Sequence, residues 1–162
     1  MPGSSHKGKR LLLPLGLAGL LLAACTKEYV SPIPYERVQI LFRPQVKWTV
    51  TGRVSTYNGV TYDLYATGDT CRKDNFRMLK LDSTLLWLDN GLKCTPLEPD
   101  TVEGHWTLSE DYQTLYLQND PDLGRPSYQI RRLDDSTMVL RWTETTVNGG
   151  TLTETVTLKG EE

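Results

Sequence analysis

From Val46 onward, hydrophobic and polar residues alternate with a period of two, which is typical of strands with one buried face. Asn58-Gly59 separates two such runs and predicts a type I′ hairpin turn, whose two central residues both need positive φ. The return strand is predicted over Val60 to Ala66, and Arg53 falls on the polar face of the first strand. The inward face of this hairpin is predicted to carry Trp48, Val50, Gly52, Val54, Tyr62 and Leu64.

Seven later segments are also strand-like and are separated mostly by short polar turns. They are Phe76 to Leu81, Thr84 to Leu88, Gly104 to Leu108, Thr114 to Gln118, Ser127 to Leu133, Thr137 to Thr145 and Thr151 to Lys159. Beyond the N-terminal apolar run, no segment has the apolar period of 3.6 residues that an amphipathic helix requires. The pattern predicts an all-β fold, an antiparallel up-and-down barrel of about eight strands, because closure removes exposed sheet edges. A two-sheet sandwich is the alternative.

Two regions do not follow this pattern of short strands and tight turns. Residues Tyr35 to Phe42 read as an edge strand or as an extended lead-in that Pro44 ends. Asp89 to Glu103 is predicted as a long loop, a length that suggests a lid over part of the barrel.

The N-terminus has the order of a secretory signal, with a cationic start, an apolar run and small residues. The apolar run, Leu11 to Leu22, is shorter than the roughly 20 residues of a transmembrane helix. Leu22-Ala23-Ala24-Cys25 resembles the bacterial lipoprotein signal. This resemblance implies cleavage before Cys25, acyl chains on that cysteine and anchoring to a membrane. An ordinary cleaved signal with an incidental cysteine is the alternative.

These features divide the chain into a signal peptide (1–24), a lipid-anchored tether with the possible edge strand (25–45) and a barrel domain (46–162). In lipoproteins of this kind an Asp after the acylated cysteine favours the inner membrane. Because Thr26 occupies that position, we expect the protein in the cell envelope, anchored to the outer membrane. Its periplasmic or surface face stays open.

Charge and cysteine content narrow the functional classes further. Without residues 1–24 the chain keeps 15 basic and 20 acidic residues, and a mildly acidic chain without a basic cluster is not expected to bind nucleic acid. With Cys25 acylated, Cys71 and Cys94 are left to pair in an oxidising envelope. Two free thiols are the alternative.

Several stretches resemble the lipocalin-like domain common in lipoproteins of the Bacteroidetes. They are Trp48, Cys71-Arg72-Lys73-Asp74-Asn75-Phe76, Cys94, Gly104-His105-Trp106-Thr107-Leu108-Ser109, Tyr128-Gln129-Ile130 and Met138-Val139-Leu140-Arg141. The resemblance extends from about Val46 to Leu158. It implies a small eight-stranded barrel with a pocket suited to an apolar ligand.

Nothing in the sequence indicates catalysis, and we expect neither an enzyme nor a cofactor or metal site. His105 is the one histidine after the signal and falls on an outward position, so no histidine cluster can form. The acidic pairs Glu110-Asp111 and Asp134-Asp135 lie in predicted tight turns, where Asp commonly caps the backbone.

Candidate ligand contacts are charged or aromatic residues at inward positions or at the expected mouth. They are Arg132, Glu154, Trp87, Tyr62 and Tyr128. Arg132 and Glu154 would hold the head group of an amphiphile, or else form an ion pair with each other or reach the rim through a bulge. Trp87 lies in a run that is apolar on both faces, which suggests a contact surface or the barrel mouth. Trp48, Trp106 and Trp142 are expected in the core.

Two functions remain from this pattern. The first is a membrane-anchored barrel that binds a small apolar or amphiphilic ligand. The second is a structural or interaction module that docks to an envelope protein partner through Leu85 to Leu88 and the disulfide loop. They differ in whether the barrel encloses a cavity of a few hundred Å³.

Overall fold

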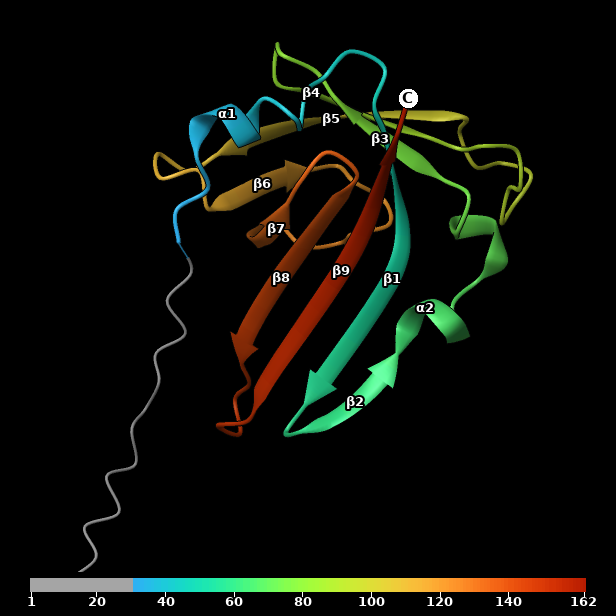
Figure 1. The fold of residues 1–162 in the computed structure, drawn as a ribbon. Helices are drawn as coiled ribbons and strands as arrows, with labels where there is room; N and C mark the ends of the chain where they lie inside the picture. The colour runs from blue at the N-terminus through green and yellow to red at the C-terminus, as the bar shows by residue number, and fades with distance from the viewer. Residues whose placement is uncertain (1–30) are drawn as a thin grey trace, which may run out of the picture.

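The computed structural model describes residues 31–162 and shows an all-β fold (Figure 1). The strands are β1 (Lys47–Tyr57), β2 (Val60–Asp63), β3 (Phe76–Leu79), β4 (Thr84–Leu88), β5 (Thr101–Leu108), β6 (Thr114–Gln118), β7 (Ser127–Leu133), β8 (Thr137–Thr145) and β9 (Thr151–Glu161). The helical segments are short: α1 (Tyr35–Val38), α2 (Leu64–Thr67) and the 3₁₀ turn η1 (Thr70–Arg72). The predicted signal peptide and Cys25 lie outside the described residues.

The strands form one antiparallel sheet in the order β2-β1-β3-β4-β5-β6-β7-β8-β9, and β1 also pairs with β9. That last pairing closes β1 and β3–β9 into an eight-stranded up-and-down barrel, with β2 as an extra strand. The predicted barrel is therefore confirmed, and the sandwich alternative is wrong. β1 pairs with β3 only at Trp48 and Thr49, and with β2 from Val54 to Tyr57.

The β1–β2 hairpin confirms the predicted turn, with φ of 47° at Asn58 and 83° at Gly59. The return strand is shorter than predicted and ends at Asp63. The Asp63 side chain accepts a hydrogen bond of 2.8 Å from the backbone N–H of Ala66, so it caps the first turn of α2 and stops the strand. β5 instead begins earlier than predicted, at Thr101, which shortens the preceding loop.

Two β-bulges reverse the predicted direction of arginine side chains. The register shifts in β1 between Val50 and Gly52, and Arg53 then stands opposite the buried Val156. A second shift in β7 lies between Ile130 and Arg132, so Arg132 points outward. Because a bulge inserts one residue, it exchanges the two faces of the strand beyond it. The predictions that Arg53 is outward and Arg132 inward are wrong for this reason.

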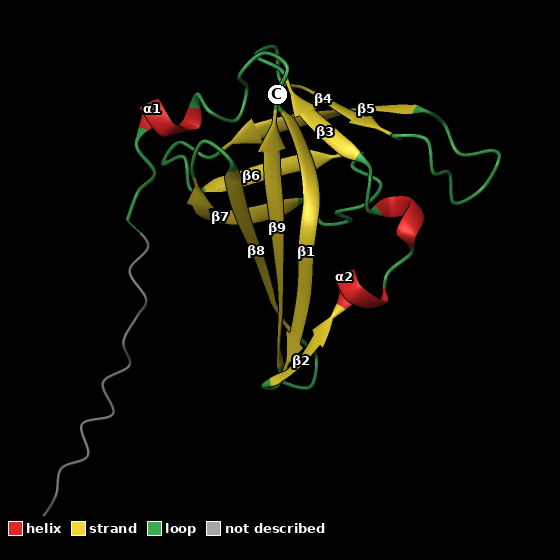
Figure 2. Ribbon diagram, turned by 45° about the vertical axis from the view of Figure 1, so that its right-hand side comes forward, coloured by secondary structure: helices red, strands yellow, loops and turns green. Residues whose placement is uncertain are grey.

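The barrel interior is filled by side chains from all eight of its strands, and the buried cluster continues into both ends. The members of this cluster that lie outside the strands are Val38, Leu41, Val46 and Leu123. At one end, α1 and the turns after it cover the opening (Figure 2). The ring of Phe42 is stacked on that of Trp106, with the ring centroids 5.9 Å apart. Residues 35–42 therefore form a helical cap, and the predicted edge strand there is wrong.

The two ends of the molecule differ in shape. Residues 35–43 lie at the end formed by the β5–β6 and β7–β8 turns, where Tyr35 contacts Tyr112 and Arg43 donates to the carbonyl oxygen of Asp135. We call this the cap end. At the opposite end, β1, β8 and β9 continue past the other strands and, with β2, form a projecting four-stranded sheet (Figures 1 and 2). We call this the open end.

Gly104 in β5 offers a direct test of packing between strands. A Cβ at this position would overlap the carbonyl oxygen of Gln118 in β6, so the strands would have to separate. We expect Gly104→Ala to lower the free energy of unfolding by about 1–3 kcal/mol, measured by urea denaturation. Gly52→Ala in β1, where an added Cβ would lie at an ordinary contact distance of 3.6 Å from Thr157, is the comparison for general effects of alanine. Equal losses in both variants would contradict the close approach.

Candidate functional site

The loop between β6 and β7, residues 119–126, folds into the barrel at the open end and closes its mouth. The Asp120 carboxylate accepts hydrogen bonds from the backbone N–H groups of Asp122 and Leu123, both at 3.0 Å, which fixes the turn. Leu123 then enters the core, and the Tyr128 hydroxyl donates to its carbonyl oxygen at 2.7 Å. Burial raises the pKa of Tyr128, which keeps this hydroxyl protonated as the donor. We call residues 119–126 the plug loop.

A buried arginine holds the plug loop in place by ion pairs with two of its carboxylates. Arg77 of β3 is 1% exposed, and its Nε lies 2.7 Å from Asp120 while its Nη2 lies 3.2 Å from Asp122. The indole N–H of Trp87 donates to Asp122 at 2.6 Å. Since both carboxylates are almost completely buried, the arginine supplies the charge that makes their burial possible.

A second arginine joins the plug loop to β9. Glu154 is 3% exposed, and its carboxylate lies 2.8 Å from Nη2 of Arg53 and 3.8 Å from Nε of Arg125. Arg53 also donates to the carbonyl oxygens of Asp122 and Leu123. The guanidinium of Arg125 stacks 3.7 Å above the ring of Trp142. Glu154 is thus neutralised by two cations and holds them in place.

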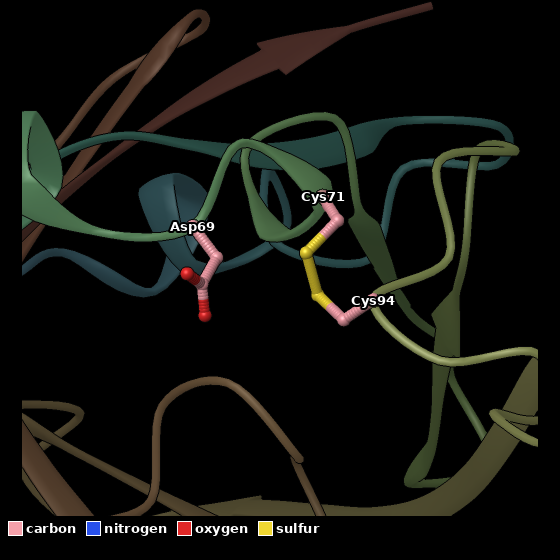
Figure 3. Close-up of side chains that lie close together, drawn as sticks. All are labelled: Asp69, Cys71 and Cys94. Atoms are coloured by element: carbon pink, nitrogen blue, oxygen red, sulfur yellow. A yellow bond between two sulfur atoms is a disulfide. The ribbon is translucent and has the colours of Figure 1, made fainter.

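A disulfide fastens a further covering segment to this region. Cys71 and Cys94 are bonded, which confirms the predicted pairing (Figure 3). Beside it, Arg72 forms ion pairs with Asp122 at 3.0 Å and with Glu98 at 3.4 Å. The bridge and Arg72 therefore connect η1, the β4–β5 loop and the plug loop.

Asp69 lies close to the disulfide, and these three residues are the described group whose atoms are near enough to share a metal ion (Figure 3). Two thiolates would be needed for such a site, but Cys71 and Cys94 are consumed by their bond to each other. Asp69, Cys71 and Cys94 therefore do not suit a metal ion in this oxidised form.

A small pocket of about 90 Å³ opens beside the plug loop, under α2 and η1. Its walls combine apolar side chains with arginine, lysine and aspartate at the rim. The lining residues are Val50, Arg53, Leu64, Tyr65, Gly68, Asp69, Arg72, Lys73, Asp122 and Leu123. The pocket is large enough for a single side chain or a few waters, and it does not reach the length of the barrel.

The sequence-based candidates are scattered rather than gathered in one cavity. Glu154 points inward, but it pairs with Arg53 and Arg125 instead of Arg132. Arg132 has 64% of its side chain exposed and pairs with its neighbour Asp134, in agreement with the alternative of a rim position reached through a bulge. Tyr128 is buried and bonded to the plug loop.

The exposure of the two remaining aromatic candidates is the reverse of what the sequence predicts. Trp87 is 1% exposed, so the prediction that it forms a contact surface is wrong. Its hydrogen bond to Asp122 of the plug loop agrees with the alternative, a place at the barrel mouth. Tyr62 is 56% exposed, because the return strand ends early and β2 lies beyond the plugged mouth. Trp106 is buried as predicted, whereas Trp142 is only half-buried beneath Arg125.

The centre of the site consists of four residues that the sequence analysis did not select. They are Arg53, Arg77, Asp120 and Asp122. Arg77 could have been found, since it shares the inward parity of Leu79 in a short strand. Asp120-Pro121-Asp122 lies between two predicted strands and its sequence predicts only a polar turn. Nothing in its composition shows that the turn folds into the barrel. Arg53 could not be found by alternation, because the bulge before it reverses the face on which its side chain lies.

The acidic residues in turns behave as expected from turn chemistry. Hydrogen bonds from Ser109 and the backbone of Gln113 lower the pKa of Asp111. Backbone and side-chain hydrogen bonds from Ser136 and Arg132 likewise lower the pKa of Asp134. His105 is exposed on β5, as its outward parity predicts. Asp111 and Asp134 stabilise two separate turns by accepting backbone hydrogen bonds.

Comparison of the sequence with protein-family models and with curated proteins finds no match. Among residues 31–162, no helix is long and apolar enough to cross a membrane. The strand pairing and the buried cluster of the described residues define a closed antiparallel β-barrel with a plugged mouth.

Proposed function

We propose that this protein is a lipid-anchored module of the bacterial cell envelope that binds a partner with its outer surface. The observation that carries the proposal is the filled interior: Trp48, Trp87 and Trp106 occupy it, and Leu123 of the plug loop enters the same core. A barrel that stores a ligand needs a cavity of several hundred Å³. The plug loop is instead held by the buried Arg77 and the partly buried Arg53. The barrel then offers its outer surface, rather than its lumen, for recognition.

Binding of a small apolar ligand is the second candidate, and the 90 Å³ pocket beside the plug loop favours it. Val50, Leu64, Tyr65 and Leu123 would contact an apolar group there, with Arg72 and Lys73 at the rim. Titration with a fluorescent fatty acid separates the two candidates. We expect no saturable binding. Saturable binding that is lost in Leu123→Ala and kept in Leu97→Ala, an exposed loop variant, would replace the first candidate by the second.

Anchoring is tested with the full chain and the variant Cys25→Ser. We expect the unsubstituted protein in the membrane fraction, with an N-terminal peptide whose mass includes acyl chains, because two or more chains give lasting membrane residence. The variant should lose that mass shift completely. Fractionation and mass spectrometry provide the measurement, and Cys71→Ser, which keeps Cys25, is the matched control. An unmodified Cys25 in the membrane-bound protein would contradict the anchor.

A further inference from the structure

Three buried oxygen atoms on neighbouring segments have no hydrogen-bond partner among residues 31–162. They are Oδ1 of Asp74, Oδ1 of Asn75 and Oδ2 of Asp89, and we call them the unpaired oxygens. Asn75 as a whole is only 3% exposed. Buried side-chain oxygens of folded proteins nearly always accept a hydrogen bond or contact an ion or water, so each exception requires an explanation. Two of these three belong to carboxylates, whose burial without a cation is costly.

The strand register places Asn75 and Asp89 opposite each other. The last pair of β3 with β4 is Phe76 with Leu88, so the next pair in the same register is Asn75 with Asp89. Counted from the backbone hydrogen bond that closes the β3–β4 turn, this is a non-hydrogen-bonded pair, the type whose side chains approach most closely. Both residues also share the parity of the buried positions in their strands. The two side chains therefore lie side by side on the inward face.

The Asp89 carboxylate is held in a way that commits only one of its oxygens. Its Oδ1 accepts a hydrogen bond of 3.0 Å from the backbone N–H of Gly91. The backbone N–H of Asp89 donates to the carbonyl oxygen of Asp100, also at 3.0 Å, which continues the pairing of β4 with β5. These two bonds fix the residue and leave Oδ2 available to a ligand. Asp74, directly before Asn75 in the chain, supplies the third unpaired oxygen.

The cationic side chains closest in sequence are engaged elsewhere. Arg72 and Arg77 pair with carboxylates of the plug loop. The ammonium group of Lys73 lies 5.0 Å from the centroid of an aromatic ring in α2. Lys93 pairs with Asp100. The charge of the two carboxylates among the unpaired oxygens is therefore not balanced by any of these four cations.

We propose that the unpaired oxygens bind a calcium ion. Two carboxylates balance the charge of one divalent cation, and carboxylate and amide oxygens are the ligands that calcium takes in proteins. Calcium accepts six to eight oxygens in irregular arrangements, and waters can complete the shell because Asp74 and Asp89 are only partly buried. Histidine, whose scarcity argued against a metal site in the sequence, is not needed for such a ligand set. The site also differs in kind from the sulfur-containing group beside the disulfide.

The ion would join the same two segments that the disulfide joins. Asp74 and Asn75 follow η1, which contains Cys71, and Asp89 begins the β4–β5 loop, which contains Cys94 (Figure 3). Calcium bound to all three residues would hold this loop against the start of β3. An ion that binds only the folded state stabilises it increasingly as its concentration rises. This inference goes beyond the proposed function and does not depend on it.

The test uses the full chain, purified in detergent, stripped of metal with EDTA and titrated with calcium chloride at constant ionic strength. We expect one saturable site by isothermal titration calorimetry, with a dissociation constant of about 10⁻⁴–10⁻³ M, the range of extracellular calcium modules. The unfolding temperature should rise with calcium concentration. Magnesium should bind at least about tenfold more weakly, because it demands regular octahedral geometry and gives up its waters reluctantly.

Two substitutions test the ligands one at a time. Asp89→Asn keeps the shape of the side chain and removes one charge, so it should weaken calcium binding at least about tenfold. Without calcium the same variant should unfold at a higher temperature than the unsubstituted protein, because a buried unpaired charge is gone. A loss of binding is thereby separated from a loss of folding. Asn75→Asp keeps an oxygen at the site and should bind calcium at least as tightly as the unsubstituted protein.

Asp135→Asn is the matched control, because it removes the same charge from an exposed turn at the cap end. Its calcium affinity should equal that of the unsubstituted protein. Absence of saturable calcium binding, equal weakening in Asp89→Asn and Asp135→Asn, or magnesium binding as tight as that of calcium would each overturn the site. Loss of calcium binding in Asn75→Asp would also overturn it, since the Asn75 amide would then act as a donor to Asp89 rather than as a ligand.

Discussion

Replacing Arg77 with methionine should lower the free energy of unfolding by about 3–5 kcal/mol, because it leaves two buried carboxylates without their cation. Arg77 contacts Asp120 and Asp122, which are themselves 2% and 8% exposed. Methionine preserves much of the side-chain volume, so the loss reports on charge rather than on a cavity. Urea denaturation followed by tryptophan fluorescence gives the measurement. The urea concentration at which half of the protein is unfolded should fall, with little change in the slope of the free energy of unfolding against urea.

Arg132→Met is the matched control for this prediction. Arg132 also pairs with an aspartate, but the pair is at the surface, where such contacts contribute about 0–1 kcal/mol. Adding Asp120→Asn and Asp122→Asn to Arg77→Met should recover part of the loss, since the unpaired charges are then removed. If Arg77→Met is no more destabilising than Arg132→Met, the arginine does not hold the plug loop.

The barrel could be predicted from the sequence because its cause is local. Alternation in β6 and β8 places Leu115, Leu117, Met138 and Leu140 inside, and the structure buries all four. Asn58-Gly59 fixes one hairpin by its own backbone preference. Closure then follows from the number of strands and the tight turns between them.

The site could not be predicted in the same way, because its causes are not local. One inserted residue between Val50 and Gly52 turned Arg53 inward, and alternation alone carries no sign of such a bulge. Asp122 acquires its role only when the plug loop folds back against Arg77 and Trp87, which lie on two other strands. The bond between Cys71 and Cys94 could be predicted, because counting the cysteines of the chain does not depend on geometry.

Removing the disulfide with Cys71→Ser and Cys94→Ser together should lower the free energy of unfolding by about 3 kcal/mol, because the bridge lowers the conformational entropy of the unfolded chain. The two cysteines are 23 residues apart in sequence. Thermal and urea denaturation measure the loss, and a reductant should destabilise the unsubstituted protein by a similar amount while leaving the double variant unchanged. A reductant effect on the double variant would show that something other than this bridge is being reduced.

The same variant should also show where the bridge acts. Cys71 belongs to η1 and Cys94 to the β4–β5 loop, and neither lies in a strand of the barrel. Arg72, next to the bridge, contacts Asp122 of the plug loop. Amide hydrogen exchange in the double variant should therefore increase in η1 and the β4–β5 loop and, through Arg72, in the plug loop. Protection in β8 and β9 should change only by the global loss of stability. Uniform exchange across all strands would mean that the bridge supports the barrel as a whole rather than the cover of its mouth.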